Sequence, residues 1–310
     1  MPTQPALVML MAAVMTAGLA GVQQRFKAGV DLVHFSVTVI DKQGSPITGL
    51  KPDDFELVEE GKAQTISYFS EGNPEDGASL GDALPLHLGV GVDTSGSMDR
   101  DIVDVRTGVI KFLLNNTAAI DFTLVDFDTE VRVTRYGPDE TERLIERIRR
   151  RKPEGWTALY DAIGVYLHSV GTQDGQKILL LYTDGGDTRS ELTFSDLLDL
   201  LKSSDVTLYT IGYLENQGSG RASQQSALQR MAAITGGQAF FPTNLKELEK
   251  IYEKIQREIA ARYGLGYLST DTRKDGAWRK VEIKLKRQDL KGAKLRTRTG
   301  YFAPYREGGH

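Results

Sequence analysis

Between residues 86 and 263 the pattern of apolar positions changes repeatedly from that of a strand to that of a helix. Leu86–Asp93 (LHLGVGVD) and Lys177–Asp184 (KILLLYTD) are nearly continuous in apolar residues, as expected for strands covered on both faces. Ile102–Leu114 instead has its apolar residues at helical spacing. Further helices are predicted at 139–150, 157–170, 194–202, 223–234 and 245–263, and further strands at 206–213 and 238–241. This alternation predicts a doubly wound α/β domain with a mostly parallel sheet.

One pair of strands in this domain has a different connection. Asp121–Asp128 (DFTLVDFD) and Glu130–Tyr136 (EVRVTRY) both have strand patterns, and too few residues separate them for a helical crossover. They must form a hairpin. We therefore expect one antiparallel strand at the edge of the sheet.

The segments on either side have a β pattern. Val33–Asp41 alternates apolar and polar residues, and Asp53–Phe69 predicts two strands around a Glu60–Gly61 turn. Near the C-terminus, Val281, Ile283 and Leu285 alternate with charged residues, and residues 293–302 (AKLRTRTGYF) predict one further strand. Neither terminal segment has enough strands for a stable sheet by itself. We therefore expect residues 30–70 and 264–305 to form one smaller β-sandwich, into which the α/β domain of residues 86–263 is inserted after a linker at 71–85.

The N-terminus contains an uninterrupted apolar stretch, Ala6–Gly21, that ends in small residues. This pattern predicts a signal peptide over residues 1–21, with an uncleaved anchor or a buried helix as alternatives. We expect a secreted, periplasmic or cell-envelope protein that touches a membrane only through that segment if it is not cleaved. The chain has no cysteine, so disulfides do not contribute to its stability.

Charge does not indicate a nucleic-acid partner. The 310-residue chain has a net charge of −4, and its one basic run is Arg147–Lys152 (RIRRRK). Proteins that bind nucleic acids through phosphates usually have a broader basic surface. We interpret the run as the end of a helix, where cations interact favourably with the helix dipole.

Acidic and hydroxyl side chains follow the first strand of the α/β domain. Asp93, Ser95 and Ser97 alternate with small residues in the crossover to the next helix, so a period of two turns them toward a common point. The loops before the helix at Thr157 and after the strand ending at Asp184 should reach the same edge of the sheet. An all-oxygen set of this kind suits a hard cation, Mg²⁺, Mn²⁺ or Ca²⁺.

These motifs, DTSGS, TALYDAI and TDGGD in this order, resemble the metal-ion-dependent adhesion site of von Willebrand factor type A domains, similar to integrin I domains. The resemblance covers residues 86–263. It implies that Ser95, Ser97 and Thr157 coordinate the ion through their hydroxyls, while Asp93 and Asp184 act mainly through bound waters and hydrogen bonds.

Two further features bear on this resemblance. Trp156 occupies a place where many members of the family have glycine, and it either narrows the mouth of the site or adds an aromatic contact. The segments around the domain also resemble a group of exported bacterial proteins with no assigned activity.

The resemblance implies a protein-binding module for adhesion, assembly or scaffolding, which captures a Glu or Asp carboxylate of a partner through the ion and is not an enzyme. Two alternatives remain open: a metal-dependent hydrolase with Asp187 as its base, and an intracellular assembly partner of an ATPase. The acids and serines of the first loop also suit simple helix capping. Asp99 and Asp101 are either ligands of a second ion or acids that interact with the helix dipole.

Overall fold

The computed structural model describes residues 32–72, 84–214 and 220–305. The predicted signal segment, residues 1–21, and most of the predicted linker at 71–85 lie outside these residues. Within them, no helix combines the length and the apolar character needed to cross a membrane.

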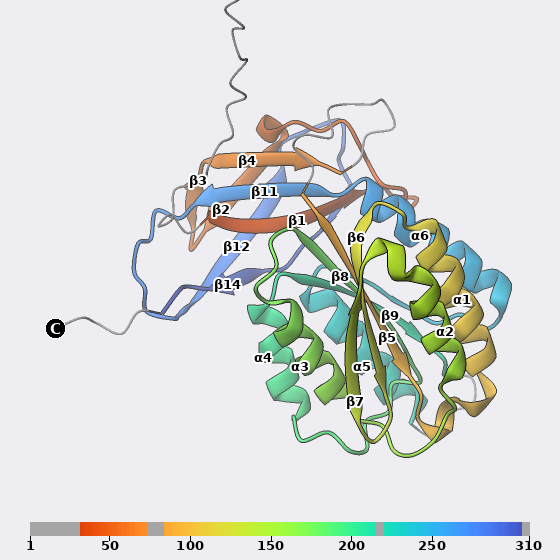
Figure 1. Ribbon diagram of the computed structural model, residues 1–310. Coiled ribbons are helices and arrows are strands. Elements are labelled where there is room, and N and C mark those ends of the chain that lie inside the picture. The colour runs from red at the N-terminus through yellow and green to blue at the C-terminus, as the bar shows by residue number, and fades with distance from the viewer. Residues whose placement is uncertain (1–31, 73–83, 215–219, 306–310) are drawn as a thin grey trace, which may run out of the picture. The chain divides into compact units, whose positions relative to one another are not determined.

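A six-stranded sheet forms the centre of the α/β part (Figure 1). Its spatial order is β10-β9-β8-β5-β6-β7, and all neighbours are parallel except the β6–β7 hairpin at one edge. This arrangement confirms the predicted doubly wound sheet with one antiparallel edge strand. The strands are β5 (Leu86–Asp93), β6 (Ala119–Phe127), β7 (Val131–Tyr136), β8 (Gln176–Thr183), β9 (Val206–Gly212) and β10 (Ala239–Phe240).

Helices cover both faces of this sheet, because the side chains of β6, β8 and β9 alternate between two separate apolar cores. Helices α1, α2 and α6 contribute to one core, and α3, α4 and α5 to the other. Their bounds are α1 (Ile102–Asn115), α2 (Thr141–Arg150), α3 (Leu159–Val170), α4 (Phe194–Ser203), α5 (Arg221–Ile234) and α6 (Leu245–Ala260).

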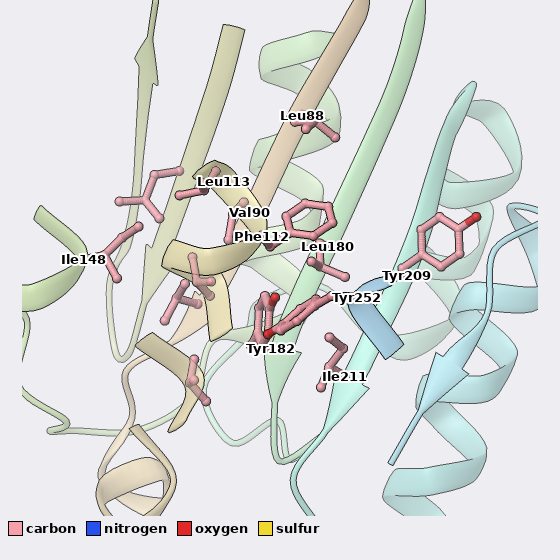
Figure 2. Packing of buried hydrophobic residues seen from close by; sticks show 14 of the residues in the cluster. Leu88, Val90, Phe112, Leu113, Ile148, Leu180, Tyr182, Tyr209, Ile211 and Tyr252 are labelled. Carbon is pink, nitrogen blue, oxygen red and sulfur yellow. The ribbon is translucent and has the colours of Figure 1, made fainter. Parts of the chain in front are cut away.

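Figure 2 shows the first of these cores, where Leu88 and Val90 of β5 and Tyr182 of β8 lie among residues of α1 and α6. Phe112 of α1 and Tyr252 of α6 have ring centroids 5.7 Å apart.

On the other face of the sheet, Gly89 of β5 allows close packing of α3. A Cβ atom at residue 89 would lie 2.3 Å from the ring of Tyr166. Residue 89 is therefore a glycine because a larger side chain would clash with Tyr166 of α3.

The terminal segments form two four-stranded sheets, β13-β1-β11-β4 and β14-β12-β2-β3, which share one apolar core. Each sheet contains strands from both ends of the chain, as the sequence predicts for the sandwich. The strands are β1 (Leu32–Ile40), β2 (Phe55–Glu59), β3 (Lys62–Gln64), β4 (Ile66–Glu71), β11 (Tyr263–Leu268), β12 (Trp278–Leu285), β13 (Lys294–Arg296) and β14 (Gly300–Phe302).

Two sequence predictions were wrong in this sandwich. Residues 53–69 contribute to three strands and not two, because β4 leaves the β2–β3 hairpin and pairs with β11 in the other sheet. The predicted single strand over 293–302 is likewise two strands, β13 and β14, which pair with β1 and β12. An alternating pattern shows which face is buried but not which sheet a strand joins.

Several helix boundaries also differ from the prediction. Helix α2 begins at Thr141 and not at residue 139, and α5 begins at Arg221 and not at residue 223. Helix α3 begins at Leu159 and not at Thr157, because the backbone N–H and C=O of Thr157 bond to the loop at 188–189. Helix α6 ends at Ala260 and not at residue 263, because Tyr263 already pairs with β1 and β4 as the first residue of β11.

Buried polar contacts join the α/β part to the sandwich. Glu258 of α6 is fully buried and forms an ion pair with Arg296 of β13. Arg298, which follows β13, donates hydrogen bonds to the backbone oxygens of Ser204 and His34, at 3.1 and 2.6 Å. These contacts bring residues at the end of α4, in α6 and in the sandwich together.

Candidate metal centre

The predicted site lies at a switch point of the sheet topology. Along the chain, β5 is followed by β6 on one side of it, and the chain later returns to form β8 on its other side. Asp93 is the last residue of β5, and Asp184 directly follows the last residue of β8. In open α/β sheets, ligands bind in the crevice at such a point, beyond the carboxyl ends of the strands.

The loop after β5 folds so that its hydroxyls converge. The backbone N–H of Ser95 donates to Oδ1 of Asp93 at 2.9 Å, and the Oγ atoms of Ser95 and Ser97 lie 3.1 Å apart. Asp93 and Ser95 are buried, whereas Ser97 lies in an exposed position of the short 3₁₀ helix Gly96–Arg100. The three side chains therefore run from the interior to the surface, as the period-two spacing suggests.

Asp93 is held in an unusual electrostatic environment. Burial raises the pKa of its carboxyl to about 7, hydrogen bonds from Ser95 and Thr183 oppose that rise, and the charge of Asp184 adds to it. The hydroxyl of Thr183 donates to Oδ2 of Asp93 at 2.6 Å. No lysine or arginine of the described residues is among the groups that shift this pKa. The site thus places the fully buried Asp93 close to a second acid, Asp184.

The loop before α3 is bound directly to the loop after β5. The backbone N–H of Glu154 donates to the carbonyl of Thr94 at 2.9 Å, and the N–H of Gly96 donates to the carbonyl of Gly155 at 3.2 Å. Gly155 has a φ of +74°, and a Cβ there would lie 2.5 Å from Oγ1 of Thr129. This contact explains the glycine one residue before Trp156.

The loop after β8 meets the same segment. The carbonyl of Thr157 accepts hydrogen bonds from the N–H groups of Thr188 and Arg189, at 2.9 and 3.0 Å, and its own N–H donates to Oγ1 of Thr188 at 3.0 Å. Within the loop, Oδ1 of Asp184 accepts from the N–H of Gly186 at 3.0 Å. Thr157 and Asp184 are both buried. Three loops that are far apart in sequence are therefore tied together by backbone contacts around the end of β5.

The remaining acids named from the sequence have other surroundings. Asp99 is exposed on the 3₁₀ helix. Asp101 is the N-cap residue of α1 and lines a small cavity of about 40 Å³ together with Asp104 and Tyr213.

Asp187 connects its loop to α3. Its Oδ1 accepts hydrogen bonds from the hydroxyl of Ser190 at 2.6 Å and from the N–H of Tyr160 at 3.3 Å. The same hydroxyl of Ser190 accepts from the N–H of Tyr160 at 3.0 Å. The carboxyl of Asp187 therefore stabilises the start of the helix.

The donor set fits a hard divalent cation. Across residues 32–72, 84–214 and 220–305, no group of three or more His, Cys, Asp or Glu side chains is arranged to hold a metal. An ion at this site would therefore depend on the serine and threonine hydroxyls as well as on the two acids. Oxygen ligands of this kind suit Mg²⁺, Mn²⁺ or Ca²⁺, and the cation would compensate the buried acids.

Sequence reasoning missed three threonines that shape the site. Thr183 bonds to Asp93, Thr188 accepts from the backbone of Thr157, and Thr129 accepts from the N–H of Trp156 at 2.9 Å. Thr183 is the first residue of the TDGGD motif, and Thr188 directly follows that motif. Trp156, in the loop before α3, is 65% exposed. Its ring is therefore available for contact with another molecule.

A doubly wound α/β domain with acids and hydroxyls gathered at its switch point is typical of a class of ligand-binding domains. Comparison with known families identifies the family within that class. The sequence model of the von Willebrand factor type A domain matches residues 90–254. The chain belongs to this family. No curated protein matches it.

Several solved structures are similar in fold. They include a von Willebrand factor type A protein from Catenulispora acidiphila, with 13% identity, a TM-score of 0.47, and coverage of 91% of this chain and 76% of that one. The PilB minor pilin from Streptococcus sanguinis has 14% identity, a TM-score of 0.47, and coverage of 73% and 87%. The vWF domain of the type V pili tip protein Mfa5 from Porphyromonas gingivalis has 15% identity, a TM-score of 0.45, and coverage of 57% and 97%.

Proposed function

We propose that this protein binds another protein by capturing an acidic side chain through a divalent cation at the end of β5. The observation that carries the proposal is the convergence of the Ser95 and Ser97 hydroxyls, 3.1 Å apart, beside a fully buried Asp93 whose pKa is shifted by no lysine or arginine of the described residues. Acids buried in this way require a compensating positive charge.

In this proposal each residue has a stated part. The hydroxyls of Ser95, Ser97 and Thr157 would hold the ion directly, and Asp93 and Asp184 would act mainly through bound waters and hydrogen bonds. When bound, the ion supplies a positive centre that attracts one further carboxylate oxygen. Largely neutral ligands leave much of its charge available for that carboxylate.

The proposed role is adhesion, assembly or scaffolding outside the cytoplasm, and not catalysis. A hydrolase would need a base beside the ion, and Asp187, the candidate from the sequence, is engaged with Ser190 and the backbone of Tyr160. The exposed Trp156 is better suited to contact with a partner protein than to catalysis. The apolar stretch Ala6–Gly21 supports export.

Calorimetric titration of Mg²⁺ and Mn²⁺ tests the metal site. We expect saturable binding to the wild type and its loss in the Ser95→Ala/Ser97→Ala double variant. Ser203→Ala is the matched control, because that hydroxyl bonds only within the last turn of α4 and lies outside the site. Equal binding by the wild type and the double variant, or none by either, would refute the proposal.

The partner is tested by retention of envelope proteins from the source cell on the immobilised protein. We expect the retained protein to be released by a chelator and to be absent with the double variant. If the retained protein stays bound in the presence of the chelator, capture through a cation is contradicted.

A further inference from the structure

Helices α1 and α2 pack side by side (Figure 1). A groove with an apolar floor and basic walls is lined by residues of both helices. Its volume is about 320 Å³. The residues that line it are Val103, Arg106, Thr107, Ile110, Lys111 and Arg149. None of them belongs to the candidate metal centre.

The floor of the groove is an aliphatic stripe on the outer side of α1. Val103 is 65% exposed, and Ile110, which is half-buried against the edge of the core, lies seven residues further on, about two helical turns, or roughly 10 Å, along the same side. Leu114, 54% exposed, continues the stripe by one turn. The opposite side of α1 is already buried in the core. A helix that is apolar on its solvent side as well favours contact with another molecule.

Three basic side chains line the groove, and the described residues neutralise only one of them. Among the described residues, neither Arg106 nor Arg149 forms an ion pair, and Nε of Arg106 is buried without a hydrogen-bond partner. Burial also lowers the pKa of Arg106. Lys111 does form an ion pair, with Glu249 of α6, on the surface.

The other arginines of α2 show that this is a local feature. Arg143, Arg147 and Arg150 form ion pairs with Glu140, Asp126 and Glu146, respectively. The basic run at the end of α2 is therefore neutralised in part, and Arg149, which faces the groove, is the member of this helix left without a carboxylate among the described residues.

We propose that this groove binds an acidic, amphipathic helical segment of a partner protein. Aliphatic side chains of the segment would cover Val103 and Ile110, and its carboxylates would pair with Arg106 and Arg149. A segment with both features fits this surface better than a uniformly charged polyanion, because the floor is apolar. The net charge of −4 on the whole chain also disfavours a general polyanion.

This contact is separate from the proposed capture of a carboxylate by a cation. The groove is lined by side chains of α1 and α2, whereas the residues of the candidate metal centre stand in the loops after β5, before α3 and after β8. Binding to the groove therefore needs no metal, and the two proposals can fail independently.

Fluorescence anisotropy with a labelled synthetic peptide tests the groove. The probe is a 14-residue peptide with leucine at every third or fourth position and glutamate elsewhere, in buffer that contains a chelator. We expect binding to the wild type that weakens at least about tenfold in Arg149→Glu and in Arg106→Glu, and severalfold in Val103→Asp. Arg149→Glu and Val103→Asp alter surface positions, so they keep the test valid if Arg106→Glu unfolds.

Three comparisons decide the result. Arg150→Glu is the matched control, because Arg150 lies on the same helix but pairs with Glu146, and we expect at most a twofold change. A peptide with serine in place of leucine should bind much more weakly, and equal binding would show a simple anion site and overturn the proposal. No binding to the wild type, or binding that is lost in Ser95→Ala/Ser97→Ala, would also overturn it.

Discussion

The carboxylate of Asp93 accepts a 2.6 Å hydrogen bond from the hydroxyl of Thr183, a residue 90 positions further along the chain. The two residues end the neighbouring parallel strands β5 and β8. This bond fixes the orientation of the one fully buried acid of the candidate metal centre. It also places Asp184, the next residue, at the same edge of the sheet.

Replacing Thr183 with valine should destabilise the protein and weaken metal binding. The change keeps the shape of the side chain but removes a donor from a buried carboxylate, which costs about 1–3 kcal/mol. Urea denaturation and Mg²⁺ calorimetry measure the two effects. Thr183→Ser keeps the donor and is the control, so equal stability of the valine and serine variants would contradict this role.

Divalent cations should stabilise the folded protein. A ligand that binds only the native state at 100 times its dissociation constant adds about 2.7 kcal/mol. We expect Mg²⁺ to raise the midpoint of thermal unfolding of the wild type and a chelator to reverse the rise. The Ser95→Ala/Ser97→Ala variant should show no change, and a similar rise in that variant would place the ion elsewhere.

Gly155→Ala should be destabilising, and Gly96→Ala nearly neutral. Gly155 has a φ of +74° and no room for a Cβ beside Thr129, so alanine there costs about 1–3 kcal/mol. A Cβ at Gly96 would meet its nearest neighbour at an ordinary 3.5 Å. Chemical denaturation of both variants measures the difference, which should vanish if the loop before α3 is not fixed in this conformation.

Glu258→Ala should destabilise the protein far more than Glu249→Ala. Glu258 is fully buried between Arg296 and the hydroxyl of Tyr209, which donates to it at 3.0 Å, so its removal leaves a buried cation uncompensated and costs about 3–5 kcal/mol. Glu249 forms an exposed ion pair with Lys111, worth about 0–1 kcal/mol. Similar free energies of unfolding for the two variants would contradict a stabilising ion pair between Glu258 of α6 and Arg296 of the sandwich.

Stability should fall as the pH falls from 6.5 to 4 because of His34. Burial, together with the charges of Arg298 and Lys177, lowers its pKa from 6.5 to about 4, although Asp205 opposes the shift. In that pH window the unfolded chain binds more protons than the folded one, so protonation favours unfolding, by an amount on the order of 1–3 kcal/mol.

The comparison that isolates His34 is the difference between the wild type and His34→Gln. Other groups titrate in the same range in both proteins, so their contributions largely cancel in the difference. Free energies of unfolding measured at pH 7 and pH 4.5 should fall more for the wild type. Parallel pH dependence of the two proteins would rule out this origin.

The local patterns were sufficient for much of the fold because they report burial directly. The continuous apolar runs at 86–93 and 177–184 became the neighbouring central strands β5 and β8, and the short connection after Asp128 formed the expected hairpin. The patterns failed where partners are distant. The alternation over 293–302 could not show that β13 and β14 join different sheets, because both sheets bury alternate residues against one core.

The sequence by itself determined the α/β architecture, the sandwich from two chain ends, and the chemistry of the oxygen donors, since spacing and residue type are local properties. Only the tertiary structure decided which of these donors lie in contact. The hydrogen bonds of Asp93 with Thr183 and of Thr157 with Thr188 join segments that are far apart in sequence. These segments meet because of the order of the strands in the sheet, which local patterns do not show. The same holds for the groove between α1 and α2. Whether Arg149 is neutralised depends on which carboxylates the fold brings within reach, and a basic run looks the same in sequence in either case.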